Sequence, residues 1–243
     1  MDSLEKRFQN IEINKTRLIP PREETEKQKS KSKFKNFAMI NKEYQEKFIN
    51  LIKECPNSLN IFVYLILNRN KYDNSVSVSL NDMQEKLNLS KNTVLKAIKI
   101  LEDNDFIQKI RTKTTNYYII NDFIVSPINK NKCEYHELSS FNKYFNFFKI
   151  NYTLLNKSTI FNIINNNKYS ISVFLFLLLE MDKQNKVEIT KKEIKQILNI
   201  SKYEVFENAI KTLEEYSFII STRDFVNHLY IFEINPQIAD NKN

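Results

Sequence analysis

The side chains with the clearest chemical potential follow Ser90, in a stretch whose apolar residues recur at helical spacing. Four of them predict a helix face buried in a core, because they are three or four residues apart: Val94, Ala97, Ile98 and Leu101. The opposite face must then carry donors and apolar groups of the kind that read a DNA major groove: Lys91, Asn92, Thr93, Leu95, Lys96 and Lys99.

Each of these residue types has a partner on double-stranded DNA. The Asn92 amide can pair with an adenine edge, while Leu95 and the Thr93 methyl group can meet thymine methyl groups. The lysines can reach phosphate or guanine. The alternative is that Lys96 and Lys99 only solvate a surface helix, which is the commonest fate of such residues.

A second basic group lies further along the chain. The alternation in Phe106–Arg111 and Tyr117–Asn121 predicts two strands of a hairpin. Lys109, Arg111 and Lys113 are spaced by two, so they share one face if the strand continues. The hairpin tip holds short donors suited to phosphate or the minor groove, Thr115 among them. Arg111 is the strongest single candidate, because its planar fork holds phosphate well.

The elements before the hairpin must position these side chains. We expect a buried helix over Leu59–Leu67, a short strand over Val76–Ser79 and a helix over Leu80–Leu87 that Ser79 caps. A turn at Asn88–Ser90 follows, and Ser90 caps the next helix, which runs to about Asp103. This order predicts a helix-turn-helix followed by a β-hairpin wing, with Ser90 among the DNA-contacting residues.

The same pattern recurs about 111 residues later in the chain. Leu87-Asn-Leu-Ser-Lys matches Leu198-Asn-Ile-Ser-Lys, and Ala97-Ile-Lys-x-Leu-Glu matches Ala209-Ile-Lys-x-Leu-Glu. We therefore expect a mainly α fold with small β-hairpin wings, in two related domains. The expected divisions are a flexible basic arm over residues 1–36, a DNA-binding domain over 37–130 and a second domain over 131–243.

The second copy differs at its outward positions. Glu204 and Glu207 lie near the end that would face a groove, and one extra residue stands between Ser201 and Ala209. Carboxylates repel phosphate, although one can accept a hydrogen bond from cytosine. We therefore expect the second domain to serve mainly dimerisation or partner binding, with DNA as a possible second contact.

The charge distribution favours a polyanionic partner. The net charge is +8, and residues 1–36 contribute +4, residues 37–130 contribute +3 and residues 131–243 contribute +1. An AT-rich coding sequence would explain part of the lysine total, but not this uneven distribution. In the arm, lysine occupies every second position from Lys27 to Lys35, which suits either tracking of phosphates or a solvated linker.

Several classes of function are excluded by composition. The chain has no glycine, so Walker loops, dinucleotide fingerprints and nucleophile elbows are absent. His136 and His228 are far apart, and Cys133-x-x-His136 is half of a metal motif, so we expect no catalytic site, metal or cofactor.

Two cysteines and no signal peptide favour the cytoplasm. The longest apolar run, Val173–Leu179, is too short for a membrane span and predicts a buried helix.

The segment SLNDMQEKLNLSKNTVLKAIKILEDNDFI, residues 79–107, resembles the winged-helix pattern of bacterial regulators and replication proteins. That pattern has a glycine before the first wing strand, where this chain has Asp105 and, in the second copy, Ser217. Aspartate tolerates left-handed backbone better than most residues, so the fold survives the first change. Ser217 is less easily explained.

Two such units in tandem, over about residues 36–235, resemble plasmid replication initiators of low-GC bacteria. The resemblance implies a non-catalytic protein that binds double-stranded DNA sequence-specifically and starts replication of a plasmid or mobile element. Its implied partners are host replication proteins and further copies of the chain, as a homodimer or DNA-dependent oligomer, and no membrane. The alternatives are a transcriptional regulator that binds an operator and an interaction adaptor similar to a helicase loader.

Overall fold

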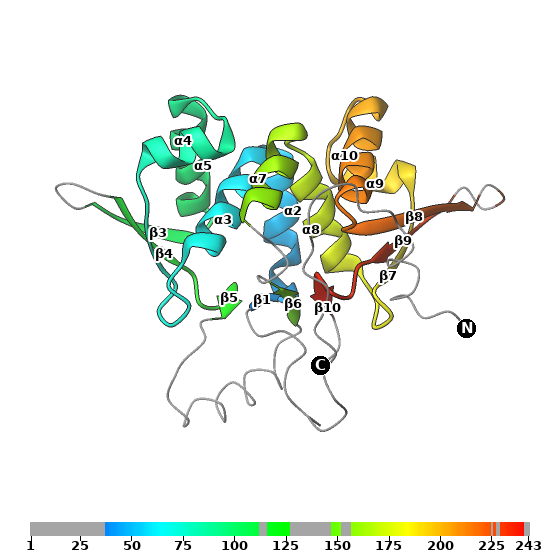
Figure 1. Cartoon of the computed structure of the whole chain (residues 1–243), viewed down its shortest axis with the longest axis horizontal. Helices are drawn as coiled ribbons and strands as arrows, with labels where there is room; N and C mark the ends of the chain where they lie inside the picture. Colours follow the sequence, from blue (N-terminus) through cyan, green and yellow to red (C-terminus); the bar gives the residue numbers. More distant parts are fainter. Residues whose placement is uncertain are drawn as a thin grey trace, which may run out of the picture.

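In the computed structural model, the described residues are 37–111, 116–126, 147–151, 157–224, 226 and 229–240. They form a mainly helical molecule with three small antiparallel sheets (Figure 1). The proposed arm, residues 1–36, lies outside the described residues.

The first unit contains the predicted elements and several that the sequence analysis did not anticipate. The predicted helices and strands correspond to α3 (Pro56–Asn68), β2 (Ser75–Ser77), α4 (Leu80–Leu87), α5 (Lys91–Asp103), β3 (Ile107–Arg111) and β4 (Asn116–Ile120). The unanticipated elements are β1 (Phe37–Asn41), a 3₁₀ turn η1 (Lys42–Tyr44), α2 (Gln45–Glu54) and β5 (Val125–Ser126).

The second unit has the same order of elements, as the internal repeat predicts. They are β6 (Phe147–Asn151), α7 (Lys157–Asn166), α8 (Ser170–Glu180), β7 (Lys186–Thr190), α9 (Lys191–Ile197), α10 (Tyr203–Glu215), β8 (Ile219–Asp224), β9 (Leu229–Ile234) and β10 (Ala239–Asp240). The apolar run Val173–Leu179 lies inside α8, which confirms the predicted buried helix.

The chain makes its left-handed turns without glycine. Among the described residues, six with positive φ occupy equivalent turns of the two units, in the pairs Asn74 and Asn185, Asn88 and Asn199, and Asp105 and Ser217. In the last pair φ is 61° at Asp105 and 58° at Ser217. A side-chain amide supports each of these two turns: Asn121 donates to the Asp105 carbonyl at 2.8 Å, and Asn235 donates to the Ser217 carbonyl at 2.9 Å. This support helps to hold the strained backbone at both positions.

A four-stranded sheet joins the two units. Its order is β10-β6-β1-β5, and β1 pairs antiparallel with β6 in a register that sets Met39 opposite Lys149. Because β1 and β6 are equivalent strands, their antiparallel pairing relates the units by an approximate two-fold axis (Figure 1). Two smaller sheets, β2-β4-β3 and β7-β9-β8, hold the hairpins at the two flanks.

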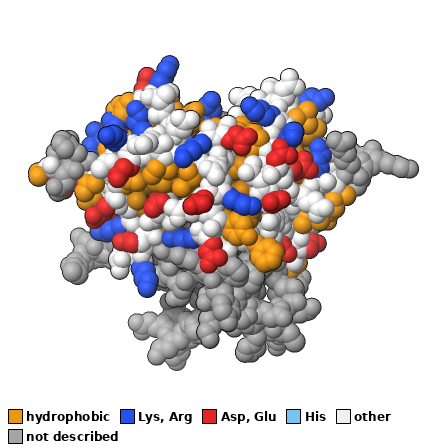
Figure 2. Space-filling view, turned by 180° about the vertical axis from the view of Figure 1, so that it is seen from behind, with side chains coloured by type: hydrophobic (Ala, Val, Ile, Leu, Met, Phe, Trp, Pro, Cys, Tyr) orange, Lys and Arg blue, Asp and Glu red, His pale blue; other side chains and the backbone are white. Residues whose placement is uncertain are grey.

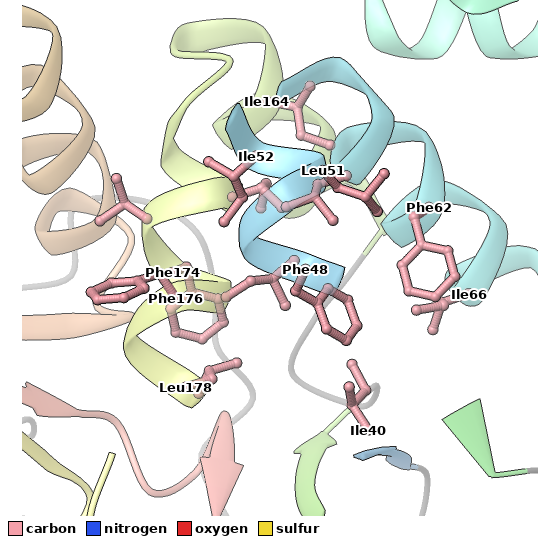
Figure 3. Close-up of a cluster of buried hydrophobic side chains, with 14 of the residues drawn as sticks. Ile40, Phe48, Leu51, Ile52, Phe62, Ile66, Ile164, Phe174, Phe176 and Leu178 are labelled. Atoms are coloured by element: carbon pink, nitrogen blue, oxygen red, sulfur yellow. The ribbon is translucent and has the colours of Figure 1, made fainter. Parts of the chain in front are cut away.

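The hydrophobic core is continuous across both units. Every residue of α8 from Ser170 to Leu179 is buried, and α8 packs against α2 and α3 of the first unit. Figure 3 shows Phe176 of α8 in the same cluster of buried side chains as Phe48 and Leu51 of α2. The predicted boundary therefore separates two segments of sequence that share one core.

Polar contacts also cross between the units. The Lys42 ammonium is buried and donates a hydrogen bond to the Met181 carbonyl at the end of α8, over 3.0 Å. Burial lowers the pKa of Lys42, and the carboxylates of Glu180 and Asp182 oppose that shift. The Asn60 amide donates to the Lys168 carbonyl at 3.2 Å. Because such bonds are directional, they add a fixed register to the apolar packing.

Replacing Tyr118 with Phe is expected to stabilise the protein by about 1 kcal/mol at neutral pH. The Tyr118 hydroxyl is buried with no hydrogen-bond partner among the described residues. The register of β2 with β4 and of β7 with β9 shows that the second unit already has Phe232 at this position. A control is Tyr230→Phe, which removes a 2.9 Å hydrogen bond to Glu207 and should lower stability.

The same variant should alter stability at alkaline pH. Burial raises the pKa of Tyr118 from 10.0 to about 12. A raised folded pKa contributes stability that is present below the unfolded value of 10.0 and is lost as pH rises towards about 12. Urea unfolding between these pH values should therefore show a shallower loss for Tyr118→Phe than for wild type. Equal losses in both proteins would contradict the assignment, since the contribution of Tyr230 is common to both.

Candidate nucleic-acid interface

The α4–turn–α5 segment is held by local hydrogen bonds that the sequence specifies. Ser79 and Asp82 form a capping box at the start of α4, with the Ser79 hydroxyl accepting from the Asp82 amide at 3.0 Å. Asn88 ends α4 in left-handed backbone with φ 48°. Ser90 then caps α5 by accepting from the Thr93 amide, as predicted. These bonds fix where α5 begins.

The two faces of α5 are those that its periodicity predicts. Val94, Ala97, Ile98 and Leu101 are buried, together with Ile100. The opposite face exposes a run of polar and basic side chains with one apolar member: Lys91, Asn92, Leu95, Lys96 and Lys99. Leu95 is 37% exposed, which leaves an apolar group available to a ligand.

The candidate residues on α5 differ in whether other groups of the protein already bind them. Lys99 forms an ion pair with Asp103 at 3.0 Å, while Lys91 and Lys96 have no ion pair within the described part of the chain. The hydroxyls of Ser90 and Thr93 lie 2.9 Å apart, so both contribute to the helix cap. Lys91 and Lys96 are therefore the cations most available to phosphate.

The hairpin β3–β4 places Lys109 on the side that faces the helices. Lys109 is paired in register with the buried Tyr118, and it shares a strand face with the buried Ile107. Lys109 is half-buried, and Arg111 is the last residue of β3. The side chain of Arg111 and the whole of Lys113 and Thr115 lie outside the described residues.

A lysine on α2 supports the junction between α5 and the hairpin. The Lys47 ammonium donates to the Asn104 carbonyl at 3.3 Å and lies 3.5 Å from the Asp105 carboxylate. These contacts fix the left-handed turn from which β3 begins. The support of this turn by Lys47 was not predicted from the sequence, because α2 itself was not predicted.

The two outward carboxylates of the second unit differ in burial and in their ion pairs. Glu204 is exposed on α10, whereas Glu207 is half-buried and fully engaged. Glu207 is 2.8 Å from the Arg223 guanidinium and 3.5 Å from the Lys191 ammonium, and it accepts a 2.9 Å hydrogen bond from Tyr230. Glu207 therefore does not present an unneutralised charge to an approaching phosphate.

The extra residue in the second unit is accommodated in its turn. The helix α10 begins at Tyr203 after Lys202, whereas Ser90 immediately precedes α5. Ser201 is therefore not a cap, and Lys202 has no side-chain capping bond. The buried residues remain in step, because Phe206 and Ala209 occupy the places of Val94 and Ala97.

Basic residues missed by the sequence analysis lie on α9. Lys191, Lys192 and Lys195 occupy positions whose equivalents on α4 are Leu80, Asn81 and Gln84. The spacing in Thr190-Lys-Lys-Glu-Ile-Lys could have revealed them, since it gathers three ammonium groups near one helix face. Figure 2 shows Lys and Arg side chains on both upper projections of the molecule.

Two other kinds of feature are absent from the described residues. They contain no group of three or more His, Cys, Asp or Glu side chains arranged to hold a metal ion. None of the helices described has the length and apolar character needed to cross a membrane. Cys133, His136 and His228 lie outside the described residues.

Comparison with known proteins gives one family. Residues 15–133 match the family described as Firmicute plasmid replication protein (RepL). The match contains the whole first unit and ends before β6, where the second unit begins. No curated protein matches the chain.

Proposed function

We propose that this protein is a non-catalytic initiator of plasmid replication that binds double-stranded DNA. The proposal rests on the match of residues 15–133 to the RepL family. We further propose that each unit is a winged helix-turn-helix, in which α5 and the β3–β4 hairpin form the recognition helix and wing of the first. The initiator would act in the cytoplasm, where it meets plasmid DNA.

One observation carries the DNA-binding proposal. The helix α5 buries its apolar face completely and exposes Lys91, Asn92, Leu95 and Lys96 together, directly after a capped turn. A helix presented in this way fits the major groove, whose width admits one α-helix. Asn92 and Leu95 would contact base edges, while Lys91 and Lys96 would hold the phosphates that set the register.

The hairpin would add phosphate contacts beside the groove. Lys109 lies on the face of β3 that points towards the helices, so a duplex lying on α5 would pass close to it, and Arg111 ends the same strand. Lys113 and Thr115 belong to the tip between the strands and extend the same proposed contact. Lys99 completes the helix contact if DNA competes with Asp103 for its ammonium.

A double substitution in the hairpin tests the wing. Arg111→Ala with Lys113→Ala should reduce the slope of log affinity against log salt by about 2, because each lost phosphate contact removes about 0.9. Fluorescence anisotropy on a labelled duplex at several salt concentrations measures the slope. Lys53→Ala with Lys183→Ala removes equal charge from exposed sites elsewhere and should leave the slope nearly unchanged. A flat slope in the wild type would contradict phosphate binding altogether.

The family match favours initiation over transcriptional regulation, although both would use the same face of α5. An initiator should bind sites clustered in its replication origin, whereas a regulator should bind an operator that overlaps a promoter. DNase footprinting across the plasmid that carries the gene distinguishes these patterns. We also propose that host replication proteins and a second copy of the chain are partners, which sedimentation with and without DNA would test.

A further inference from the structure

A basic hollow of about 890 Å³ lies in the second unit, between α9, the start of α10 and the far ends of β8 and β9. Its cations come from separate elements: Lys191, Lys192 and Lys195 from α9, and Arg223 from β8. The negative charges at the hollow are the two carboxylates of Glu207 and Asp224, against four positive charges. The hollow is therefore net positive.

The charges inside the hollow are unequally compensated. Glu207 neutralises part of the charge of Arg223 and Lys191, at 2.8 Å and 3.5 Å. Lys192 and Lys195 form no ion pair among the described residues, and Lys192 is exposed at the rim. An incoming anion would therefore meet two uncompensated ammonium groups beside a guanidinium that is already held in place.

Two tyrosines order the cations. The Lys191 ammonium lies over the ring of Tyr203, and the Arg223 guanidinium lies over the ring of Tyr230, 5.1 Å from its centroid. The two hydroxyls are 3.2 Å apart, and both rings line the floor of the hollow. Cation–π contacts of this kind restrict long side chains before a ligand arrives, which lowers the entropic cost of binding.

The hollow lies on the surface that corresponds to the DNA-facing side of the first unit. With Phe206 equivalent to Val94, Tyr203 takes the place of Lys91 and Glu207 takes the place of Leu95. The positive charge that lies on α5 in the first unit therefore lies on α9 and the β8–β9 hairpin in the second. The outer face of α10 retains the exposed Glu204 and pairs Lys211 with Glu215 at 3.8 Å.

We propose that this hollow is a second DNA contact, which holds backbone phosphate of the duplex on Lys192, Lys195 and Arg223. This inference rests on the proposed function and assigns to the second unit a contact that does not use the outer face of α10. Guanidinium and ammonium groups gathered from separate elements are the usual phosphate ligands. The exposed rim at Lys192, Tyr203 and Arg223 suits a polymer lying across the surface.

The test compares two double variants of the full chain. Lys192→Gln with Lys195→Gln spares the residues that pair with Glu207, so the floor of the hollow stays intact. On a random-sequence duplex, this variant should lose about 10-fold to 100-fold in affinity, and its salt slope should fall by about 2. The matched control is Lys183→Gln with Lys211→Gln, which removes equal charge and includes the outer face of α10.

Each outcome decides the proposal. Equal losses in both variants, or an unchanged slope in Lys192→Gln with Lys195→Gln, would overturn it while wild-type binding still supported the proposed function. No salt-dependent binding by the wild type would instead remove the proposed function. A titration with ATP covers the other source of phosphate: ATP binding that the first variant loses while its DNA binding is unchanged would assign the hollow to free nucleotides and overturn the proposal.

Discussion

Reversing the charge of Lys91 and Lys96 together should lower the affinity for duplex DNA by about 100-fold or more. Both side chains are exposed on the same face of α5, and neither has an ion pair in the described part of the chain. Glutamate at both positions removes two phosphate contacts and adds repulsion in their place. The fold should persist, because the buried face of α5 is unchanged and exposed substitutions alter stability little.

The control is Lys53→Glu with Lys183→Glu, which makes the same change in net charge at exposed sites away from α5. Anisotropy measures affinity, and circular dichroism checks that both variants remain folded. A loss of similar size in both variants would show that only the total charge matters, and would contradict a specific role for α5. In a plasmid that depends on this gene for replication, the α5 variant should fail to establish transformants, whereas a pure regulator would leave replication intact.

Truncating Phe176 to alanine should destabilise the whole molecule by about 3–5 kcal/mol. Phe176 is fully buried on α8 and belongs to the same hydrophobic cluster as Phe48 and Leu51 of the other unit (Figure 3). Since the core is continuous, the cavity should weaken both units together. The melting temperature should fall by about 10 °C, because each kcal/mol corresponds to about 2–4 °C in a chain of this size.

Hydrogen exchange provides the decisive measurement. Amides of α3 in the first unit and of α10 in the second should lose protection by the same factor in Phe176→Ala. Phe123→Ala is the matched control, because this ring is 56% exposed and its loss should change stability by less than about 0.5 kcal/mol. Loss of protection confined to α10 would show that the two units unfold independently.

Local chemistry explains which elements could be predicted. The Ser79 and Ser90 caps, the apolar spacing on α5 and the alternation on the hairpin involve residues within a few positions of each other, and the structure has all of these features. The helix α2 was missed although its buried residues Phe48, Leu51 and Ile52 have helical spacing. The side-chain cap at Asn41 belongs to the preceding 3₁₀ turn, and α2 itself begins at Gln45 without a side-chain cap, so no cap marks its own start.

The candidate site was predictable to the same extent. The exposed face of α5 follows from periodicity alone. The engagement of Glu207 does not, because its partners Lys191 and Arg223 each lie 16 residues away, on opposite sides in the sequence. Only the folded hairpin brings Arg223 over α10, and a carboxylate that the sequence presents as repulsive is thereby neutralised.

By itself, the sequence determined two repeated units of similar elements, the helix caps and the polar face of α5, because these depend on neighbours along the chain. The tertiary structure decided how the units meet. The pairing of β1 with β6 joins residues about 110 positions apart, and the burial of Lys42 against Met181 depends on that pairing. The basic hollow likewise exists only where α9, α10 and the β8–β9 hairpin converge, since Arg223 is far from the lysines of α9 in the sequence.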